Sequence, residues 1–521
     1  MLIKPEFKKL VLKLGEPERV LAVITSAKTI VYKGTTLVVV PHRDEEVRIL
    51  HNLGIDAPMP IEHYYKWPKV GGNHKPFDHQ VDTASFLTRH HRAYCLNDMG
   101  TGKTASVLWA YDYLRSTGRV KKMLVVSPLS TLDETWGNTI FRTFPHLTFS
   151  VLYGTRERRL KLLDNDVDVF IINHDGLVIL GDVIAKRGDI DLVVIDEIAQ
   201  AARNAGTDRW RALKKLVPHP LRRCWGLTGT PTPNSPVDAW AQCRLVTPDT
   251  VPAYKGVFRD MTMKQLGPYK WVARPEAAAI VAKAMSPAIR YKRDECIDLP
   301  PVTYETRSVE LTAEQKAAYK SMLNKLHSEI DGTEVTAVNE AVKAMKLVQI
   351  ACGAVYGNDG DTAFVPATSR LELTHEIIEQ AGSKVIVFVP FTGALLAMAE
   401  YLRKKGHTVE IVNGSVSKRE RDRIFTAFQN TENPRVLVAQ ASAMSHGLTL
   451  TAASVIVWFA PVNSLDTYEQ AGARITRPGQ RLNQLIINIE GTPVERAMYA
   501  RLQKKGKMQG ILLDTIKEGC K

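Results

Sequence analysis

No uninterrupted apolar run in the sequence approaches the roughly 18 residues that a membrane-spanning helix needs. The first ten residues, MLIKPEFKKL, carry charges but no apolar segment of the kind found in secretory signal peptides. We therefore expect a cytoplasmic chain that neither spans a membrane nor is exported.

Cysteine is scarce, with six residues that lie far apart in the chain. None forms a Cys-x-x-Cys pair or a spaced Cys/His cluster, the usual sequence signs of a structural zinc site. The pattern indicates free thiols in a reducing compartment and excludes a disulfide-stapled scaffold. There is also no low-complexity tract, and 45% hydrophobic with 24% charged residues is an ordinary globular composition.

Positive charge is in moderate excess: 69 Lys and Arg against 55 Asp and Glu give a net charge of +14. This excess suits a polyanionic partner such as nucleic acid, although a solvated basic face would also account for it. At roughly 150 residues per domain, the length predicts about three domains.

The hydrophobic pattern indicates an α/β fold with two parallel-sheet lobes in tandem. In both lobes, short and fully apolar runs alternate with helical segments, which is typical of parallel sheets covered on both faces. A small N-terminal α/β unit precedes them, an irregular helical spacer separates them, and a basic helix follows. The predicted parts are 1–70, 71–250, 251–370, 371–493 and 494–521.

The expected strands are short apolar runs between helical segments. In the first lobe they are Ala93–Leu96, Met123–Ser127, Val169–Asn173, Leu192–Ile195 and Cys224–Leu227. In the second lobe they are Val385–Val389, Val409–Val412, Val436–Ala439 and Val455–Phe459. The spacer is expected to hold a helix over Ala313–Ile330 and a loop over Gly357–Asp361.

In the N-terminal unit, Val20–Ile24 and Thr29–Val40 are predicted strands, and Arg43–Leu53 is a predicted helix that ends at Gly54. A Pro- and Gly-rich connector, Ala57–Pro76, follows. Its rings would either stack on bases or pack against the next domain, and we favour packing. They belong to His63, Tyr64, Tyr65 and Trp67.

The strongest local signal is a Gly-rich loop between an apolar strand and the helical run Ala105–Leu114. It consists of Asn97, Asp98, Met99, Gly100, Thr101, Gly102, Lys103 and Thr104. In this setting, backbone N–H groups surround phosphate oxygens and the helix N-terminus adds its positive dipole. Lys103 would reach the β- and γ-phosphates and Thr104 would bind Mg²⁺. The usual pattern begins with Gly, where Asn97 stands here.

A second signal is the pair Asp196-Glu197, which directly follows the apolar run Leu192–Ile195. The first carboxylate would hold Mg²⁺ through water and the second would orient the attacking water. Both would lie at the carboxyl edge of the parallel sheet, where such folds bind ligands.

A third signal lies in the second lobe, where Gln470, Arg474 and Arg477 belong to the segment QAGARITRPGQ. Because the arginines are three residues apart, they would share a face on a helical turn. They are either solvated side chains near a helix end or arginine fingers that complete a phosphate site across a cleft. With the first two signals present, we favour the fingers.

Smaller segments fit the same scheme. Gln80 lies before the phosphate-loop strand and would read an adenine edge. The segments Thr228–Pro231 and His446–Leu450, which includes Gly447, each follow a strand. Their hydroxyl and N–H groups suit contacts to nucleic-acid phosphates.

Taken in order, these segments resemble the helicase motifs of superfamily two, and most closely the Swi/Snf-type DNA-dependent ATPases. The resemblance extends from Phe77 to roughly Arg501. Its segments include NDMGTGKT, LVVSPLSTLDETW, VVIDEIA, LTGTPTPN, NGSVSKRERDRIFTAF, HGLTLTAA and QAGARITRPGQ. The short region between the lobes is similar to phage-encoded or bacterial members, so the cytoplasm concerned would be that of a host cell for a phage protein.

The resemblance implies two RecA-like lobes with ATP and Mg²⁺ in the cleft. The first lobe would supply Lys103, Thr104, Asp196 and Glu197, and the second Arg474 and Arg477. Duplex DNA would cross both lobes, gripped at its backbone by Ser127–Leu129, Asn173–Asp175, Thr228–Thr230 and Gly447–Thr449. The expected protein is a monomer that moves along or remodels duplex DNA in replication, recombination or repair, with proteins of those processes as further partners.

Two positions depart from the family pattern. Ala199 replaces a His that ordinarily links hydrolysis to the DNA-contacting loop, with Gln200 as the candidate substitute, and Pro233 replaces a Gln. Neither departure removes a group that contacts phosphate or Mg²⁺, so we expect hydrolysis to persist. A strand-separating helicase and a hydrolysis-poor, ATP-gated DNA clamp stay open as alternatives. No separation pin is evident in the sequence, which favours translocation.

Overall fold

The computed structural model describes residues 1–70, 74–217, 222–268, 270–296, 298–325, 327–330, 333–336, 340–357, 361–444 and 449–519. The chain forms two compact units. The first consists of Met1–Pro231, Pro236–Cys296 and Leu512–Lys521, and the second of Thr232–Ser235 and Ile297–Ile511. The sequence-based boundaries at residues 250 and 370 stay a prediction.

The N-terminal part of the first unit is an antiparallel sheet of four strands in the order β1-β2-β4-β3. Its elements are β1 (Leu2–Lys4), β2 (Lys9–Leu12), α1 (Pro17–Val23), β3 (Lys28–Tyr32), β4 (Thr35–Pro41) and α2 (Asp44–Asn52). The predicted strand Val20–Ile24 is wrong. Pro17 at the first helical position and Glu18 in the first turn begin a helix there, and that helix turns Val20 into the core.

The other two N-terminal predictions are confirmed. The run Thr29–Val40 is a hairpin whose turn residues, Lys33 and Gly34, both have positive φ, at 45° and 76°. The helix predicted over Arg43–Leu53 is α2, and Gly54 follows its end with a φ of 79°.

The connector packs against the first lobe, as we favoured. The ring of Trp67 lies 5.2 Å from that of Tyr65 and 5.8 Å from that of Trp109, between ring centroids. The Trp109 indole N–H donates to the carbonyl of Pro68 at 2.9 Å, and the Tyr65 hydroxyl donates to Asp112 at 2.5 Å. Tyr65 and Trp67 are therefore used in packing rather than as a free stacking surface.

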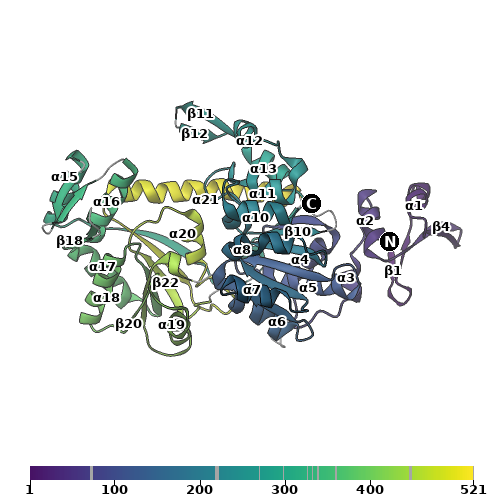
Figure 1. The fold of residues 1–521 in the computed structure, drawn as a ribbon, viewed down its shortest axis with the longest axis horizontal. Helices are drawn as coiled ribbons and strands as arrows, with labels where there is room; N and C mark the ends of the chain where they lie inside the picture. The colour runs from purple at the N-terminus through teal and green to yellow at the C-terminus, as the bar shows by residue number, and fades with distance from the viewer. Residues whose placement is uncertain are drawn as a thin grey trace. The chain divides into compact units, whose positions relative to one another are not determined.

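The first lobe is a parallel sheet of seven strands in the order β13-β5-β10-β9-β6-β8-β7 (Figure 1). The strands are β5 (Arg92–Cys95), β6 (Lys122–Ser127), β7 (Phe149–Leu152), β8 (Val169–Asn173), β9 (Ile190–Asp196), β10 (Arg223–Leu227) and β13 (Ala288–Ile289). All five predicted strands are confirmed. The sequence missed the two edge strands, β7 and β13, and the second of these returns from the predicted spacer to pair with β5.

Apolar side chains from alternate residues of the strands enter two different cores. Met123 and Val125 of β6 belong to one core, with Trp109, and Leu124 and Val126 belong to the other. Helices therefore cover both faces of this sheet, which confirms the doubly covered parallel sheet. The helices are α4 (Asp78–Arg89), α5 (Lys103–Ser116), α6 (Asn138–Thr143), α7 (Arg156–Leu163), α8 (His174–Ala185), α9 (Ile198–Ala201), α10 (Asp208–Leu216), α11 (Asp238–Val246), α13 (Ala277–Ala284) and α14 (Arg293–Cys296).

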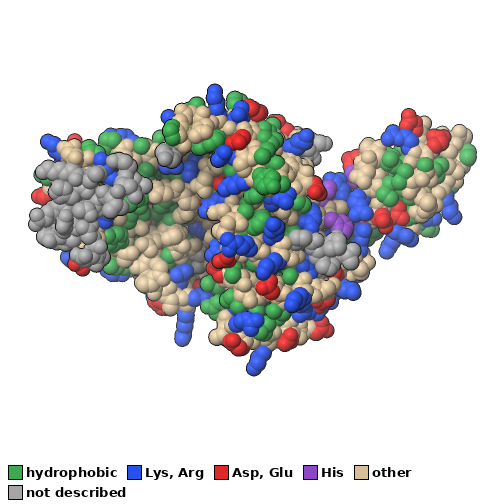
Figure 2. Space-filling view, turned by 45° about the horizontal axis from the view of Figure 1, so that its top comes forward, with side chains coloured by type: hydrophobic (Ala, Val, Ile, Leu, Met, Phe, Trp, Pro, Cys, Tyr) green, Lys and Arg blue, Asp and Glu red, His purple; other side chains and the backbone are tan. Residues whose placement is uncertain are grey.

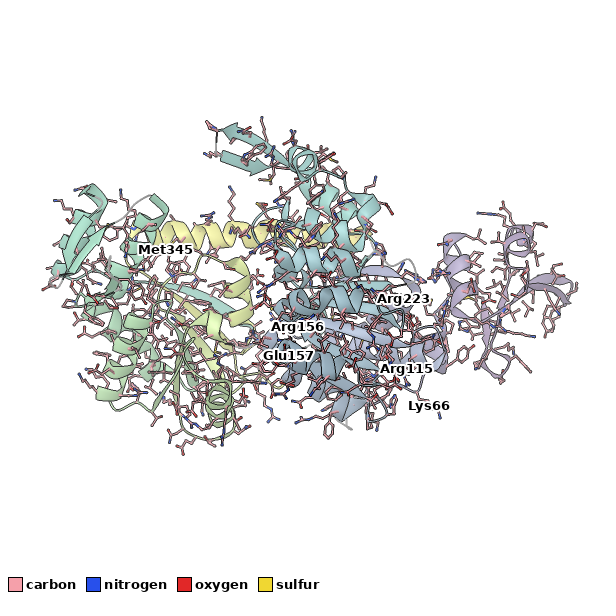
Figure 3. All side chains as sticks on the ribbon, in the orientation of Figure 1. Lys66, Arg115, Arg156, Glu157, Arg223 and Met345 are labelled. Atoms are coloured by element: carbon pink, nitrogen blue, oxygen red, sulfur yellow. The ribbon has the colours of Figure 1, made fainter. Side chains whose placement is uncertain are left out.

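Charged side chains fix the amino ends of the strands (Figure 3). Arg223 begins β10 and donates to the carbonyls of Thr88 and His90, each at 3.3 Å. Arg115, near the end of α5, pairs with Asp168 at 2.5 Å, directly before β8. These contacts hold the edge of the sheet opposite to the loops that the sequence predicts to be functional.

A hairpin that the sequence did not predict projects from the first unit (Figure 1). The hairpin consists of β11 (Met263–Gly267) and β12 (Lys270–Ala273), and the helix α12 (Lys255–Thr262) leads into it. The guanidinium of Arg259 lies 4.2 Å from the centre of the Trp271 ring, and Arg274 Nε donates to the Met263 carbonyl at 3.1 Å. Leu266, near the turn, is 56% exposed.

The second unit contains a parallel sheet of six strands in the order β14-β23-β22-β19-β21-β20. The strands are β14 (Val302–Ser308), β19 (Lys384–Phe388), β20 (Val409–Val412), β21 (Val436–Ala439), β22 (Ala453–Trp458) and β23 (Gln484–Glu490). The four predicted strands are confirmed, and β14 and β23 extend one edge. With two parallel sheets of this kind, the chain has tandem RecA-like lobes.

The second unit has further helices and short strand pairs outside this sheet. They are α15 (Ala313–Lys325), β15 (His327–Ile330), β16 (Thr333–Thr336), α16 (Glu340–Cys352), β17 (Ala354–Tyr356), β18 (Thr362–Phe364), α17 (Thr368–Gln380), α18 (Thr392–Lys404), α19 (Lys418–Asn430), α20 (Leu465–Gly472) and α21 (Pro493–Gly519). The helix predicted over Ala313–Ile330 is too long, because the chain turns into the β15–β16 hairpin after Lys325. Of the predicted loop, Gly357 and Asp361 are bonded to each other, and residues 358–360 lie outside the described residues.

The predicted C-terminal helix is α21. Its last part is counted with the first unit, where Leu512, Leu513 and Ile516 are buried. There Asp514 pairs with Lys292 at 2.7 Å, and Lys517 pairs with Glu295. Among the described residues, no helix is both long and apolar enough to cross a membrane.

Candidate nucleotide site

The phosphate loop is the turn that connects β5 to α5. Gly100 and Gly102 have left-handed backbones, with φ of 86° and 83°, and Gly102 is the N-cap of α5. A Cβ at position 102 would lie 2.1 Å from the side-chain nitrogen of Gln80. The left-handed backbone therefore favours glycine at this position, and a Cβ would in addition have to displace the end of the Gln80 side chain.

Lys103 lies within the turn that this loop makes. Its ammonium donates to the carbonyls of Asn97 at 2.9 Å and Asp98 at 3.2 Å. Lys103 and Thr104 are the first two residues of α5, and both are half-buried. A cation and a hydroxyl at a helix N-terminus form the arrangement that binds the phosphates and metal of a nucleotide.

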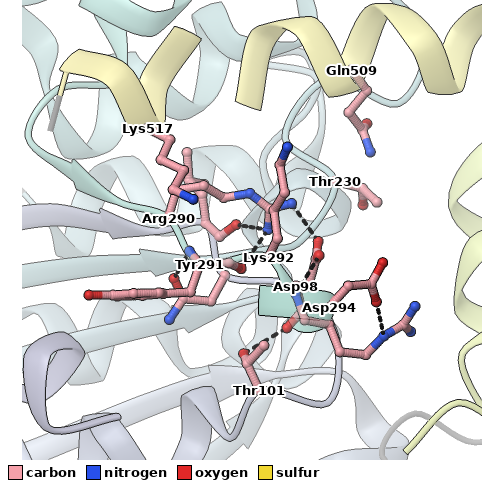
Figure 4. Close-up of polar contacts among 12 residues, drawn as sticks. Asp98, Thr101, Thr230, Arg290, Tyr291, Lys292, Asp294, Gln509 and Lys517 are labelled. Carbon is pink, nitrogen blue, oxygen red and sulfur yellow. Dashed lines mark hydrogen bonds and ion pairs between the residues drawn. The ribbon is translucent and has the colours of Figure 1, made fainter. Parts of the chain in front are cut away.

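The first residues of the loop serve mainly to hold it in place (Figure 4). Asn97 donates to Thr83 Oγ1 at 2.9 Å and accepts from the Tyr291 N–H at 2.9 Å. Asp98 pairs with Arg290 at 2.6 Å and accepts from the Arg293 N–H at 3.0 Å. These side chains join the loop to the segment that follows β13, and their contact with a nucleotide stays a prediction.

Gln80 lies beside the same loop. Its side-chain oxygen accepts from the Phe77 N–H at 3.1 Å, and its nitrogen donates to the Thr101 carbonyl at 3.1 Å. His79 donates to the same carbonyl at 2.9 Å. Thus α4 braces the phosphate loop through two neighbouring side chains. The adenine contact of Gln80 stays a prediction.

Asp196 ends β9 and is buried beneath the site. One carboxylate oxygen accepts from the Trp136 indole N–H at 2.9 Å, and the other accepts from the Glu197 N–H at 3.1 Å. Burial raises the pKa of Asp196, while the Trp136 hydrogen bond and the charge of Lys103 act in the opposite direction. Sequence reasoning missed Trp136, because nothing in its local pattern separates this ring from an ordinary core tryptophan.

Glu197 has a strained backbone, with a φ of 48° in the left-handed region, and it precedes the short helix α9. Such a conformation costs a non-glycine residue about 1–3 kcal/mol and is concentrated at functional sites. The Thr228 hydroxyl donates to the Glu197 carboxylate at 3.4 Å. Ala199 is buried, whereas Gln200 is exposed and does not occupy the buried position of the replaced His.

The loop after β10 lies against the phosphate loop. Thr228 is fully buried, and its hydroxyl accepts from the Thr230 N–H at 3.1 Å. A Cβ at Gly229 would lie 3.5 Å from the Asn97 carbonyl oxygen and 3.6 Å from Met99 Cγ, which is ordinary contact distance. Phosphate loop, acidic pair and threonine loop therefore form one connected group at the carboxyl edge of the first sheet.

Of the two other first-lobe loops predicted to grip DNA, Asn173–Asp175 uses its polar side chains within the protein. Asn173 accepts from Arg159 at 3.1 Å, and Asp175 pairs with Arg209 at 2.6 Å. Ser127 is fully buried, whereas Leu129 is 54% exposed. Contacts between these loops and DNA stay a prediction.

The arginines of the second unit lie in turns that follow α20, so the prediction that they share a helical face is wrong. Gly472 ends the helix before either arginine. Arg474 is 3% exposed, which also excludes a solvated side chain, and Arg477 Nε donates to the Ala473 carbonyl at 3.3 Å. Their action on ATP stays a prediction. Gly447 and its neighbours, residues 445–448, lie outside the described residues.

A profile of the SNF2-related domain matches residues 79–353, and one of the helicase conserved C-terminal domain matches residues 369–479. The chain belongs to the SNF2-related family. This confirms the resemblance seen in the sequence and the class of enzyme expected from it, an ATP-dependent helicase or translocase of the SNF2 type.

Individual relatives agree with this assignment. Protein p41 of Acyrthosiphon pisum secondary endosymbiont phage 1 is 26% identical over 472 residues, which cover 85% of this chain and 98% of p41. The ATP-dependent helicase MG018 of Mycoplasma genitalium is 27% identical, with 81% of this chain and 40% of MG018 covered. The Bacillus subtilis helicase/translocase YwqA is 26% identical, with 79% and 46% covered. The chain thus spans nearly all of the phage protein but less than half of the two bacterial relatives.

Among solved structures, the Sulfolobus solfataricus SWI2/SNF2 ATPase core in complex with dsDNA is similar. The two sequences are 25% identical, and the TM-score is 0.41. The match covers 87% of this chain and 95% of that one.

Proposed function

We propose that this SNF2-family chain is an ATP-driven motor that moves along or remodels duplex DNA. The proposal rests on the connected group in the first unit, which supplies each part that phosphoryl transfer to water needs. Lys103 would stabilise the charge on the β- and γ-phosphates. Glu197 would orient the attacking water and accept its proton. Arg474 and Arg477 would supply positive charge from the second unit.

The site also suits Mg²⁺. This ion prefers oxygen ligands and keeps several of its waters. The Thr104 hydroxyl and the Asp196 carboxylate are such ligands, and the hydrogen bond from Trp136 orients the carboxylate. Bound Mg²⁺ would neutralise charge on the phosphate oxygens. Asp196 and Thr104 would then position the nucleotide relative to Glu197.

The observation that carries the DNA part of the proposal is the contact between Thr228 and Glu197. The loop that the family resemblance assigns to the DNA backbone is thereby bonded to the residue assigned to the attacking water. DNA phosphates that contact the loop Thr228–Thr230 would shift the buried Thr228 hydroxyl away from Glu197 and leave the carboxylate able to hold the water. This route does not use position 199, so hydrolysis could respond to DNA although Ala199 replaces the usual His.

The charge distribution is compatible with this partner. Lys and Arg side chains are spread across the face in Figure 2, with Asp and Glu between them. Affinity based on backbone contacts should fall steeply with salt and be indifferent to sequence. We place the motor in DNA replication, recombination or repair in the cytoplasm. We expect a monomer, which light scattering after gel filtration would check.

The test is steady-state ATP hydrolysis without nucleic acid, with single-stranded DNA, with duplex DNA and with RNA. Strong stimulation by the duplex that is lost in Glu197→Gln supports the proposal. Stimulation mainly by single strands would replace it with an unwinding helicase. Absence of hydrolysis under every condition would indicate the ATP-gated clamp.

A matched pair of variants tests the coupling route. Thr228→Val keeps the shape of the side chain but removes the donor to Glu197, so stimulation by duplex DNA should change while DNA affinity stays within about twofold. Thr230→Val is the control, because its side chain belongs to the same loop and its backbone bond to Thr228 is kept. Equal stimulation in Thr228→Val and in the unmodified chain would refute the route.

A second candidate, strand separation, is favoured by the β11–β12 hairpin. It projects from the first unit, ends near the exposed Leu266, and is flanked by Lys264, Lys270 and Arg274. An apolar tip between basic strands is the form expected of a pin that divides two DNA strands. Unwinding of a forked duplex that Leu266→Ser abolishes, with duplex-stimulated hydrolysis retained, would establish this function. Loss of both activities would contradict a separate role for the hairpin.

A further inference from the structure

Three metal-ligating side chains meet in the second unit, and the ATPase function uses none of them. His375 and Glu379 are four residues apart on α17, which places them on one face of the helix. His407 comes from the turn between α18 and β20. Among the residues that the structure describes, this is the one group of three such side chains whose ligand atoms all lie within 4.8 Å of one another.

We propose that His375, Glu379 and His407 bind a transition-metal ion, with Zn²⁺ as the expected ion. The separations fit joint coordination. His375 Nδ1 is 3.0 Å from His407 Nε2, and His407 Nε2 is 3.3 Å from Glu379 Oε1. Ligand atoms at about 2.0–2.1 Å from a tetrahedral Zn²⁺ lie about 3.3 Å from one another.

Hydrogen bonds alone do not satisfy this arrangement. A neutral imidazole nitrogen carries at most one hydrogen, so His407 Nε2 satisfies either His375 or Glu379. The other contact is then left without a hydrogen bond, because a nitrogen that donates its hydrogen cannot also accept one, and this happens next to a side chain that is 5% exposed. A cation that accepts electrons from all three atoms removes this conflict.

The surroundings fix one of the ligands and leave access for an ion. The turn that carries His407 is closed by a bond from its N–H to the Leu402 carbonyl at 3.1 Å. The Glu379 side chain is 57% exposed, so an ion can enter there and water can provide a fourth ligand.

The donor set also selects the ion. Two imidazoles and one carboxylate suit Zn²⁺ and its neighbours in the transition series, whereas Mg²⁺ and Ca²⁺ take oxygen ligands. The bound ion would join the end of α17 to the turn before β20, and thus stabilise the second unit.

The experiment uses the full chain, stripped with a chelator and titrated with Zn²⁺ or Co²⁺. We expect one ion per chain, with the visible absorption of tetrahedral Co²⁺ and a raised melting temperature. His375→Ala, Glu379→Gln and His407→Ala should each lower the affinity by roughly tenfold or more. The control is His146→Ala in the first unit, where His146 contacts the single carboxylate of Asp112.

Each outcome decides the proposal. Stoichiometric binding that the three variants lose and His146→Ala retains supports it. Absence of binding to the unmodified chain, or binding that is equal in all variants, would overturn it. If His407→Ala does not fold, His375→Ala and Glu379→Gln carry the test, because these two side chains are the more exposed members of the set. The readouts do not depend on ATP hydrolysis.

Discussion

The two parallel sheets share an architecture but bury their charged groups in different places. In the first unit, a group of polar side chains lies at the carboxyl edge of the sheet: Lys103 bonded to the phosphate loop, the buried Asp196, and Glu197 with its donor Thr228. In the second unit, the most deeply buried ion pair joins Arg370 of α17 to Glu495 of α21, with 2% and 0% of the side chains exposed. The comparison teaches that the first unit also places charged groups at the edge where a ligand would bind, whereas the buried pair of the second unit holds two helices together.

The largest effect is expected where the second unit depends on that pair. Arg370 and Glu495 approach to 2.8 Å, and Glu495 also accepts from the Gly491 N–H and the Thr492 hydroxyl. Arg370→Ala should destabilise the unit by about 3–5 kcal/mol, because it leaves a buried charge unpaired. Denaturant unfolding of the full chain followed by circular dichroism measures the loss.

The matched control is Arg423→Ala. Arg423 pairs with Glu410 and Glu420 at the surface and is 53% exposed, so a far smaller loss of stability than in Arg370→Ala is expected. Equal losses of unfolding free energy in Arg370→Ala and Arg423→Ala would show that the buried pair stabilises the unit no more than a surface pair does.

The next effect concerns the first unit. Lys103→Ala should lower ATP turnover by about 100-fold or more, because the substitution removes the ammonium group that would neutralise the phosphates of ATP. The free energy of unfolding should change little. Lys404→Ala, in an exposed pair on the second unit, is the control and should keep full turnover. Near-normal hydrolysis by Lys103→Ala would contradict the assignment of the phosphate loop as the ATP-binding site.

Acid should act on the first unit through its buried histidines. Burial is the main cause that lowers the pKa of His174 to about 4 and of His90 to about 3. Since both values lie below the unfolded value of about 6.5, the native state binds fewer protons and stability falls as the pH drops from 6.5 towards 4. For His174 alone, the loss between pH 7 and pH 5 is about 2 kcal/mol.

Tryptophan fluorescence during unfolding measures this effect, because seven of the eight tryptophans lie in the first unit. In His174→Gln the change in stability between pH 7 and pH 5 should be smaller by that amount. A pH dependence identical to that of the unmodified chain would show that His174 is not the group responsible.

The smallest effect concerns the orientation of Asp196. Trp136→Phe keeps an aromatic ring but removes the N–H that holds the carboxylate, so the Mg²⁺ concentration for half-maximal hydrolysis should rise by about tenfold. Trp240→Phe is the control, since the Trp240 N–H donates to the carbonyl of Pro252. An unchanged Mg²⁺ requirement in Trp136→Phe would mean that packing alone orients Asp196.

The central strands of both sheets could be predicted because each is a continuous run of apolar residues, a pattern that is visible in the local sequence. The phosphate loop could be predicted for the same reason, since its glycines and lysine are adjacent in sequence. The edge strands β7 and β13 are short, and pairing with distant residues decides their conformation. The helix at Val20 was missed because a buried apolar run of this length fits both a strand and a helix.

The contacts that complete the site could not be predicted. Trp136 reaches Asp196 from 60 residues earlier in the chain, and Thr228 reaches Glu197 from 31 residues later. Such pairs depend on the order of strands in the sheet, which local pattern does not encode. The turns at Arg474 and Arg477 were missed because the helix before them ends at Gly472 without a following proline until after Arg477.

The left-handed backbone of Glu197 means that the position proposed to orient the attacking water lowers the stability of the chain that carries it. Selection for folding alone would place Gly or Asn there, since these residues adopt that conformation at lower cost. Glu197→Asn should therefore melt higher than Glu197→Gln while both retain ATP without turning it over. A chain with Asn at this position should be a stable variant that holds ATP on DNA without hydrolysing it, and would suit isolation of the ATP-bound complex.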